Sequence, residues 1–235
     1  MTGGTALITV PVMILFGVPA RTALATNMVT LTLMSAGGTL PFVWSAEIDR
    51  RRAPVLTGLT LVGSVIGAMF VFVAPAELLP LIIPVAMVFV LIFLVANPRI
   101  GLPWATVPSR RRMQAGYAVA FVLSIYGGFF SGGYVTMLIA AFVFFFGYSM
   151  LQSIVMARLL NVASSLIATC VFAWHRAIDW PLALVLGCAA FSGALLGARW
   201  ARTVPQKLLR TVFLVAVAAL AAKSLIVDIP WARLR

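Results

Sequence analysis

The stretch 116–147, GYAVAFVLSIYGGFFSGGYVTMLIAAFVFFFG, contains no charged residue and is interrupted in its middle by GGFFSGG, residues 127–133. As one straight helix it would be about 48 Å long, whereas the hydrocarbon core of a membrane is about 30 Å thick. We therefore expect two short helices that meet inside a membrane, either as a re-entrant hairpin or as a broken helix. Irregular backbone at that depth persists only where it faces protein or a water-filled cavity. A second interpretation is that the glycines only allow helices to pack closely.

The composition supports the membrane interpretation, because 63% of the residues are hydrophobic and only 9% are charged. A soluble chain of 235 residues does not need so much apolar surface, so we predict an all-α polytopic protein of the cell inner (plasma) membrane. The apolar runs are continuous and do not alternate every second residue, which excludes a β-barrel. The net charge of +12 comes mostly from basic residues between the runs, where they set topology and meet lipid headgroups; nucleic acid is not an expected partner.

The second half of the chain repeats the first at an offset of 130 residues, as between Asp49 and Asp179. Further pairs at this offset are Phe42 and Phe172, Gly63 and Gly193, Gly67 and Gly197, and Pro75 and Pro205, while Gly3-Gly4 matches Gly132-Gly133 with a one-residue gap. Matches at glycine, proline and aspartate are informative because each residue serves a specific backbone need. Both aspartates are expected to cap the helices that follow them.

The loop charges indicate that the two repeats are inverted. The loop at 45–53 carries three arginines, whereas its counterpart at 175–181 carries only Arg176. The bias is the opposite for the next pair, since 73–78 has no basic residue and 199–210 has four. Basic residues favour the cytoplasmic side of the membrane. In one pair of corresponding loops the basic member belongs to the first half, and in the next pair it belongs to the second half, which indicates that the two halves have opposite orientations.

We therefore predict two inverted repeats, each made of an element broken at Gly-Gly and three transmembrane helices. The first repeat covers 1–97 and lacks its first half-helix, a basic cytoplasmic linker covers 98–114, and the second repeat covers 115–235. The expected full spans include 53–73, 78–97, 149–174, 181–201 and 207–227. Gly58, Gly63 and Gly67 are expected to pack one face of the span at 53–73 against a neighbour.

Arg158 is the most informative single residue. It lies about 13 Å into a predicted span, and no acidic residue occurs within any apolar run to neutralise it. A charge in that position usually faces a cavity or a ligand, and a small anion is its natural partner. The alternative is that the side chain extends to the interface or bonds to backbone carbonyls.

The predicted site combines this charge with two half-helix N-termini, whose free N–H groups attract anions. Its residues are Gly3, Gly4, Thr5, Thr26, Asn27, Gly132, Gly133, Tyr134, Arg158 and Asn161. For Thr26, Asn27 and Asn161, a hydrogen bond between helices is the competing interpretation. No enzyme, metal or other cofactor is expected, because a single histidine, His175, cannot build a metal cluster or a Ser/His/Asp set.

Several strings in order carry a resemblance to a known family. They are GGTALITVPVMILFG, ALATN at 23–27, EID at 47–49 and VGSVIGA at 62–68, followed by the second-half SGG, AID, FSGALLGARWA and P-x-K-L-L-R at 205–210. With these strings the chain resembles the TauE/SafE family of sulfite exporter-like membrane proteins along nearly all its length. The resemblance implies transport of small anions such as sulfite, sulfonates or related organic anions.

The chain departs from the family pattern at three places. An apolar half-helix usually precedes the first glycine pair, so we expect an N-terminally shortened member. The usual A-x-G-T reads ALAT at 23–26, and its second-half equivalent reads SIVM at 153–156. The predicted function is therefore a membrane transporter, an exporter in direction, for a small anion bound at the repeat interface. One alternative is a channel or uniporter, and another is a non-transporting scaffold subunit. Whether the protein assembles into a homo-oligomer is left open.

Overall fold

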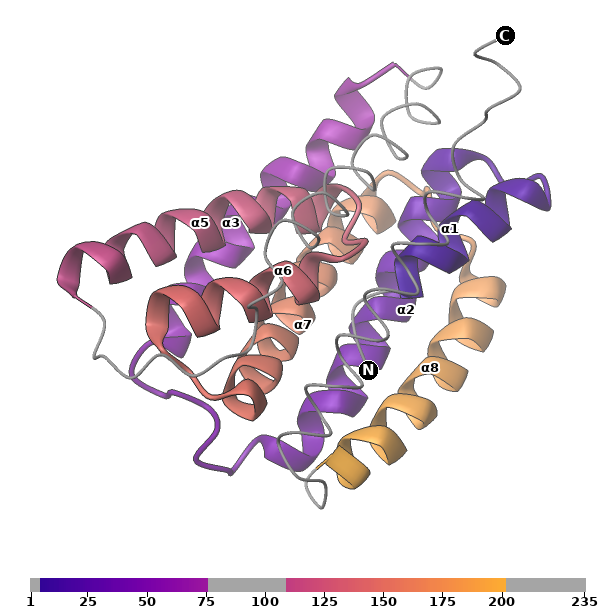
Figure 1. The fold of residues 1–235 in the computed structure, drawn as a ribbon. Helices are drawn as coiled ribbons and strands as arrows, with labels where there is room; N and C mark the ends of the chain where they lie inside the picture. The colour runs from indigo at the N-terminus through magenta and orange to yellow at the C-terminus, as the bar shows by residue number, and fades with distance from the viewer. Residues whose placement is uncertain (1–4, 76–108, 202–235) are drawn as a thin grey trace, which may run out of the picture.

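The computed structural model describes residues 5–75 and 109–201, and every regular element in these ranges is a helix. The long helices are α1 Thr5–Leu15, α2 Ala20–Thr39, α3 Ala53–Val73, α5 Arg110–Phe129, α6 Tyr134–Ala141, α7 Met150–Trp174 and α8 Trp180–Ala201 (Figure 1). Two short elements, the 3₁₀-helix η1 at Leu40–Phe42 and the π-helix η3 at Phe142–Phe146, follow α2 and α6. The predicted spans 78–97 and 207–227 lie outside the described residues.

Three of the described helices are long and apolar enough to cross a membrane, and these are Ala53–Val73, Met150–Trp174 and Trp180–Trp200. Their positions agree with the spans predicted at 53–73, 149–174 and 181–201. Apolar side chains on their outer faces, such as Val62, Leu166 and Val185, are more than half exposed in the isolated chain. In the described residues the chain is therefore all-helical, as predicted, and it has helices that could span a membrane.

The glycine-rich break is present where the sequence predicts it. Helix α5 ends at Phe129 and α6 begins at Tyr134, and α6 returns beside α5 (Figure 1). The reversal uses two residues with left-handed backbone, Ser131 with φ of 62° and Gly133 with φ of 77°. Glycine adopts such angles without steric cost, which explains its place at the start of α6. Of the two predicted arrangements, the hairpin is the one that forms.

The start of α5 differs from the prediction. The linker was expected to extend to residue 114, but the helix begins at Arg110 and includes the arginine triplet in its first turn. Ser109 caps this end, because its side chain accepts a hydrogen bond from the Arg112 N–H. Arg112 also donates to the carbonyl of Phe144 in η3. These two contacts stabilise a basic first turn that the helix dipole alone disfavours.

Close contacts define the directions of α2, α3, α7 and α8 relative to one another. Residues Ser35 and Gly38 of α2 meet Asn161 and Arg158 of α7, so α2 and α7 are antiparallel. Thr26 and Gly37 of α2 meet Asp179 and Phe191, so α8 runs parallel to α2. Ser64 and Phe72 of α3 meet Ser164 and Phe172, so α3 runs parallel to α7.

Glycines let α3 and α5 approach closely. A Cβ at Gly67 would lie 1.9 Å from the carbonyl oxygen of Ile125, and one at Gly128 would lie 2.2 Å from that of Ser64. Gly63 faces the same helix, with Phe121 O at 3.0 Å. The predicted packing role is thus correct for Gly63 and Gly67, whereas a Cβ on Gly58 would meet no atom of the described residues within 4 Å.

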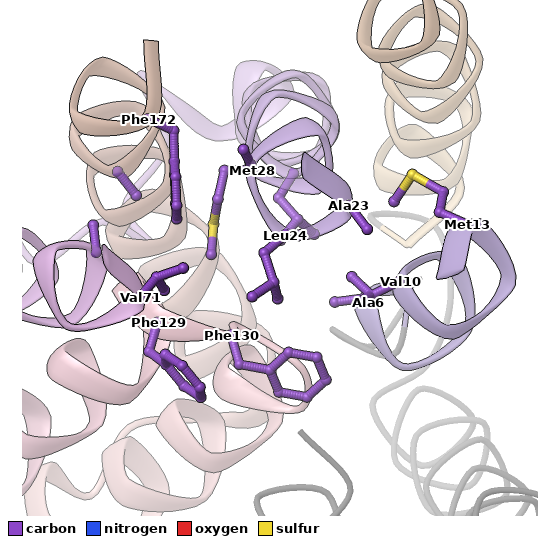
Figure 2. Close-up of a cluster of buried hydrophobic side chains, with 14 of the residues drawn as sticks. Ala6, Val10, Met13, Ala23, Leu24, Met28, Val71, Phe129, Phe130 and Phe172 are labelled. Atoms are coloured by element: carbon purple, nitrogen blue, oxygen red, sulfur yellow. The ribbon is translucent and has the colours of Figure 1, made fainter. Parts of the chain in front are cut away.

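The break lies within the apolar core. Phe129 and Phe130, which end α5, join a buried cluster with Leu24 of α2 and Val71 of α3, to which α1 also contributes (Figure 2). Figure 2 shows the two rings beside Leu24, with Ala6 of α1 on the other side. Side chains from four helices therefore enclose the irregular backbone, which satisfies the requirement for such backbone at membrane depth.

The two aspartates of the repeat both cap backbone N–H groups. Asp179 accepts a hydrogen bond from the Leu182 N–H at 3.1 Å in the first turn of α8, as predicted. Asp49 accepts from the N–H groups of Arg51 and Arg52, each at 3.1 Å, in the turn that leads into α3. The two loops that hold these aspartates lie at opposite ends of α2, since Asp179 is next to Thr26 and residues 43–52 follow η1.

Candidate functional site

Arg158 is buried in the middle of the described helices. It lies eight residues after the start of α7, about 12 Å along the helix, and its side chain is 6% exposed. The guanidinium is pressed against α2 at Gly38, where a Cβ would lie 1.9 Å from Nη1. The acidic residues that the structure describes, Glu47, Asp49 and Asp179, all lie outside the helices. The arginine that the sequence singles out in this span is therefore buried among the described helices.

Asn161, one turn from Arg158, connects three elements. Its Nδ2 donates a hydrogen bond to Ser35 Oγ of α2 at 2.6 Å. Its Oδ1 accepts one from the hydroxyl of Ser131, in the break between α5 and α6, at 3.3 Å. All three side chains are buried, with at most 2% exposure. The α7 face that carries Arg158 and Asn161 is thus in direct contact with the break.

The first turn of α6 supplies backbone N–H groups next to this contact. The leading N–H groups of a helix have no acceptor within the helix, and they carry its partial positive charge. Gly133 precedes α6 in a left-handed conformation, and Tyr134 donates its own N–H to Ser131 O at 3.2 Å. The carbonyl of Gly132 accepts from the Tyr126 hydroxyl, so the loop backbone is held in place from α5.

The side chain of Tyr134, for which the sequence predicts no role, joins a cluster of hydroxyl groups. Its hydroxyl lies 3.0 Å from Ser124 Oγ, which donates in turn to Thr60 at 3.1 Å or to the Ala120 carbonyl. Nearby, Ser64 donates to Ser164 Oγ at 2.7 Å. These hydroxyls form a fully buried cluster between α3, α5, α6 and α7 that supports the hairpin.

Sequence reasoning missed this cluster. Thr60 and Ser64 stand four residues apart, on the same face of the otherwise apolar α3. Small polar residues on one face of a membrane helix commonly mark a contact with another helix, and this spacing was the available signal.

Thr26 and Asn27 lie away from Arg158. The Thr26 hydroxyl accepts a hydrogen bond from the Asp179 N–H at 3.1 Å, and Asn27 Oδ1 accepts from Thr9 of α1 at 2.8 Å. Along α2, Asn27 is eleven residues from Gly38, a separation of about 16 Å. The structure therefore brings together Arg158, Asn161 and the break, and it places Thr26 and Asn27 in a second polar group.

The remaining predicted site residues belong to the N-terminus. Gly3 and Gly4 lie outside the described residues, and Thr5 is the first residue of α1. In the part of the chain that the structure describes, no group of three His, Cys, Asp or Glu residues could hold a metal ion.

A charged cluster at one end of the bundle was not predicted. Asp49 accepts hydrogen bonds from the Tyr148 hydroxyl at 2.6 Å and from Arg52 at 3.0 Å, and Arg52 also donates to Tyr148 at 3.4 Å. Burial alone would raise the pKa of the Asp49 carboxyl, but the hydrogen bonds from Tyr148 and the Arg52 N–H, with the Arg52 charge, outweigh it and lower that pKa. Burial raises the pKa of Tyr148. At neutral pH the cluster thus contains an ion pair and a neutral phenol.

Comparison with known proteins places the chain in a family. The model of the sulfite exporter TauE/SafE family matches residues 1–224. The chain is similar to the probable membrane transporter protein ORF9 of a Sinorhizobium species, with 24% identity over 96% of this chain and 86% of the relative. It is also similar to the probable membrane transporter protein YfcA of Escherichia coli K12, with 26% identity over 96% of this chain and 83% of the relative.

A probable membrane transporter protein of Haemophilus influenzae is 23% identical over 98% of this chain and 90% of its own length. No solved structure matches the chain. The family match and the names of these relatives support a membrane transporter. The match over nearly the whole length confirms the resemblance found in the sequence, and the chain belongs to the sulfite exporter TauE/SafE family.

Proposed function

We propose that the protein is a carrier that exports small anions such as sulfite, sulfonates or related organic anions across the cell inner (plasma) membrane, which it crosses several times. The single observation that supports this most directly is Arg158, a cation buried at 6% exposure in an apolar helix one turn from Asn161. An arginine within an apolar span commonly marks a substrate pathway, and a small anion is a natural ligand for it. The printed description of the family, sulfite exporter, supports the substrate class.

In this proposal the anion binds where α2, α7 and the α5–α6 break meet. Arg158 supplies the charge, Asn161 and Ser131 supply hydrogen bonds, and the backbone at Gly132, Gly133 and Tyr134 supplies the positive end of the α6 dipole. A guanidinium is planar and offers paired N–H groups that match two oxygens of a sulfite, sulfonate or carboxylate. The contact from Ser131 to Asn161 holds the break against the helix that carries the charge.

Asn27 would form a second polar position on the same pathway, with Thr26, Thr9 and the glycine pair Gly3-Gly4 before Thr5. The Asn27 side chain is fully buried, and its Nδ2 has no hydrogen-bond acceptor among the described residues. A buried amide N–H without an acceptor is costly, so an oxygen of a passing anion would be stabilised there. The separation of about 16 Å from Gly38 makes this position distinct from that of Arg158.

The transport proposal includes the two inverted repeats. At the offset of the sequence repeat, α2 corresponds to α7 and α3 corresponds to α8. The members of each pair run in opposite directions, which supports inversion. Helix α2 is antiparallel to α7. Because α2 is parallel to α8 and α3 is parallel to α7, α3 is antiparallel to α8 as well. In transporters built this way, the substrate site lies at the interface between the repeats, near the middle of the membrane.

The experiment is anion flux in liposomes that contain the purified protein, with sulfite, sulfate, sulfoacetate, acetate and chloride as substrates. Arg158→Ala is expected to lower flux by about 10- to 100-fold, because removing one partner of a buried charge contact costs a few kcal/mol. Arg158→Lys should restore only part of the flux, since a point charge replaces a planar fork. Arg199→Ala, at an exposed arginine of α8, is the matched control.

Unchanged thermal unfolding of each variant would show that the fold is intact. Saturation and counterflow identify a carrier, whereas single-channel conductance identifies the channel alternative. If Arg158→Ala transported every anion at the wild-type rate, the site would be wrong. If no anion moved in the wild type, the scaffold alternative would replace the proposal.

A further inference from the structure

Two arginine triplets that are far apart in the sequence lie together at one end of the bundle. Arg50–Arg52 precede α3, and Arg110–Arg112 form the first turn of α5. The parallel helices α3 and α5 both begin there, and Arg52 Nη2 lies 3.5 Å from the sulfur of Met113. Because α3 is apolar enough to cross a membrane, this end of the helix lies where a membrane surface would be.

The acidic residues of this region do not neutralise the triplets. Asp49 is already engaged by Arg52 and by the Tyr148 hydroxyl, at 3.0 and 2.6 Å. Glu47 is the other carboxylate of the loop, so two carboxylates face six arginines. Four of these arginines have exposed side chains: Arg50, Arg51, Arg110 and Arg111. The region therefore carries an excess of positive charge that is accessible from outside the protein.

Exposed aromatic rings lie directly beside the arginines. The Arg50 guanidinium lies 5.7 Å from the ring centre of Trp44, which is 86% exposed. The Arg112 guanidinium lies 4.7 Å from the ring centre of Phe144, which is 44% exposed. A cation above an exposed ring presents a charged head and an apolar surface to the same ligand, as the interface of a membrane requires.

We propose that this arginine–aromatic surface, made of residues 44, 50–52, 110–112 and 144, binds the headgroup of an anionic phospholipid. The guanidinium groups of the four exposed arginines of the two triplets hold the phosphate, and Trp44 and Phe144 lie at the boundary between the glycerol region and the acyl chains. A free phosphate ion would use only the guanidinium groups, whereas the exposed rings fit a lipid. The bound lipid would connect the loop before α3 to the start of α5. This proposal does not depend on anion transport.

The test measures lipid retention by native mass spectrometry of the purified full chain, with phosphatidylglycerol and phosphatidylcholine offered in equal amounts. The wild type is expected to retain phosphatidylglycerol preferentially. Arg50→Gln, Arg51→Gln, Arg110→Gln and Arg111→Gln should each lower its retention about fivefold, and the combined variant should retain both lipids equally. Arg52 is left unchanged because it pairs with Asp49.

Arg176→Gln removes the same charge from an exposed residue at the opposite end of the bundle, and it should retain phosphatidylglycerol as the wild type does. Trp44→Ala keeps every charge and should still lower retention. Inorganic phosphate, added in excess, should not displace the lipid. The proposal is overturned if the combined arginine variant retains phosphatidylglycerol normally, or if phosphate displaces it, which would indicate a site for free anions.

Discussion

Gly38 determines where the charge of Arg158 can lie. The absence of a side chain on this α2 residue leaves the space that the guanidinium occupies, and any Cβ there would overlap Nη1. The neighbouring Gly37 serves a different contact, since a Cβ on it would lie 2.6 Å from the backbone oxygen of Phe191. One glycine of the pair therefore positions the Arg158 side chain, and the other allows α8 to approach α2.

Gly38→Ala is expected to displace the Arg158 guanidinium without removing its charge, because the end of a flexible side chain moves more easily than a helix backbone. Anion flux in liposomes should fall about tenfold, as misplacement of a binding group by about 1 Å can cause losses of this size or larger. The thermal unfolding temperature should stay close to that of the wild type.

Gly58→Ala is the matched control for this change, since a Cβ on Gly58 would meet no atom within 4 Å in the part of the chain that the structure describes. If Gly38 acts through Arg158, then Gly38→Ala should have no further effect on flux in an Arg158→Ala background. An equal loss of flux in both backgrounds would assign Gly38 to helix packing alone.

At the scale of elements, the crossing of α3 and α5 depends on glycine at positions where backbone meets backbone. We expect Gly67→Ala to lower the free energy of unfolding by about 1–3 kcal/mol, because its Cβ would lie 1.9 Å from Ile125 O and the helices must separate. Thermal unfolding in detergent measures the change, with Gly58→Ala as the control on the same helix. A Gly67→Ala variant as stable as the control would contradict the close crossing.

The difference between these glycines shows what spacing alone can predict. Gly63 and Gly67 are four residues apart, about 40° around the helix, and both face α5. Gly58 is five residues before Gly63, about 140° away, so it faces outward although it belongs to the same series. The break at 127–133 was predictable because a charge-free stretch too long for one span is expected to be interrupted at its glycines, but the sequence left open whether the chain reverses there.

Other features needed the three-dimensional structure. The basic start of α5 looks like a linker in the sequence, because arginines oppose the dipole at a helix N-terminus; the Ser109 cap overrides that signal. Thr26 and Arg158 lie at similar distances from the starts of α2 and α7, six and eight residues in. Because the two helices are antiparallel, similar depth places these residues at opposite ends. The sequence could therefore indicate the polar residues of the site and not which of them meet.

At the scale of the whole molecule, helix direction provides the argument for inverted repeats. The loop at 43–52 follows the C-terminal end of α2, while the loop at 175–179 lies beside its N-terminal end, through the hydrogen bond from Asp179 to Thr26. A membrane crossed by α2 would therefore separate the two loops. Parallel repeats would place these corresponding loops on the same side.

Labelling of single cysteines tests this arrangement in intact cells. Ala46→Cys and Arg176→Cys, both at exposed positions, are introduced after the native cysteines are removed by Cys170→Ala and Cys188→Ala. A membrane-impermeant maleimide should label the cysteine at 176 from outside the cell. The cysteine at 46 should react only after the membrane is permeabilised, because its arginine-rich loop is expected in the cytoplasm.

Complete reaction of both variants in detergent provides the control for accessibility. If both cysteines were labelled from the same side of the membrane, inverted repeats would be ruled out. A substrate site at the interface between inverted repeats would then be ruled out as well.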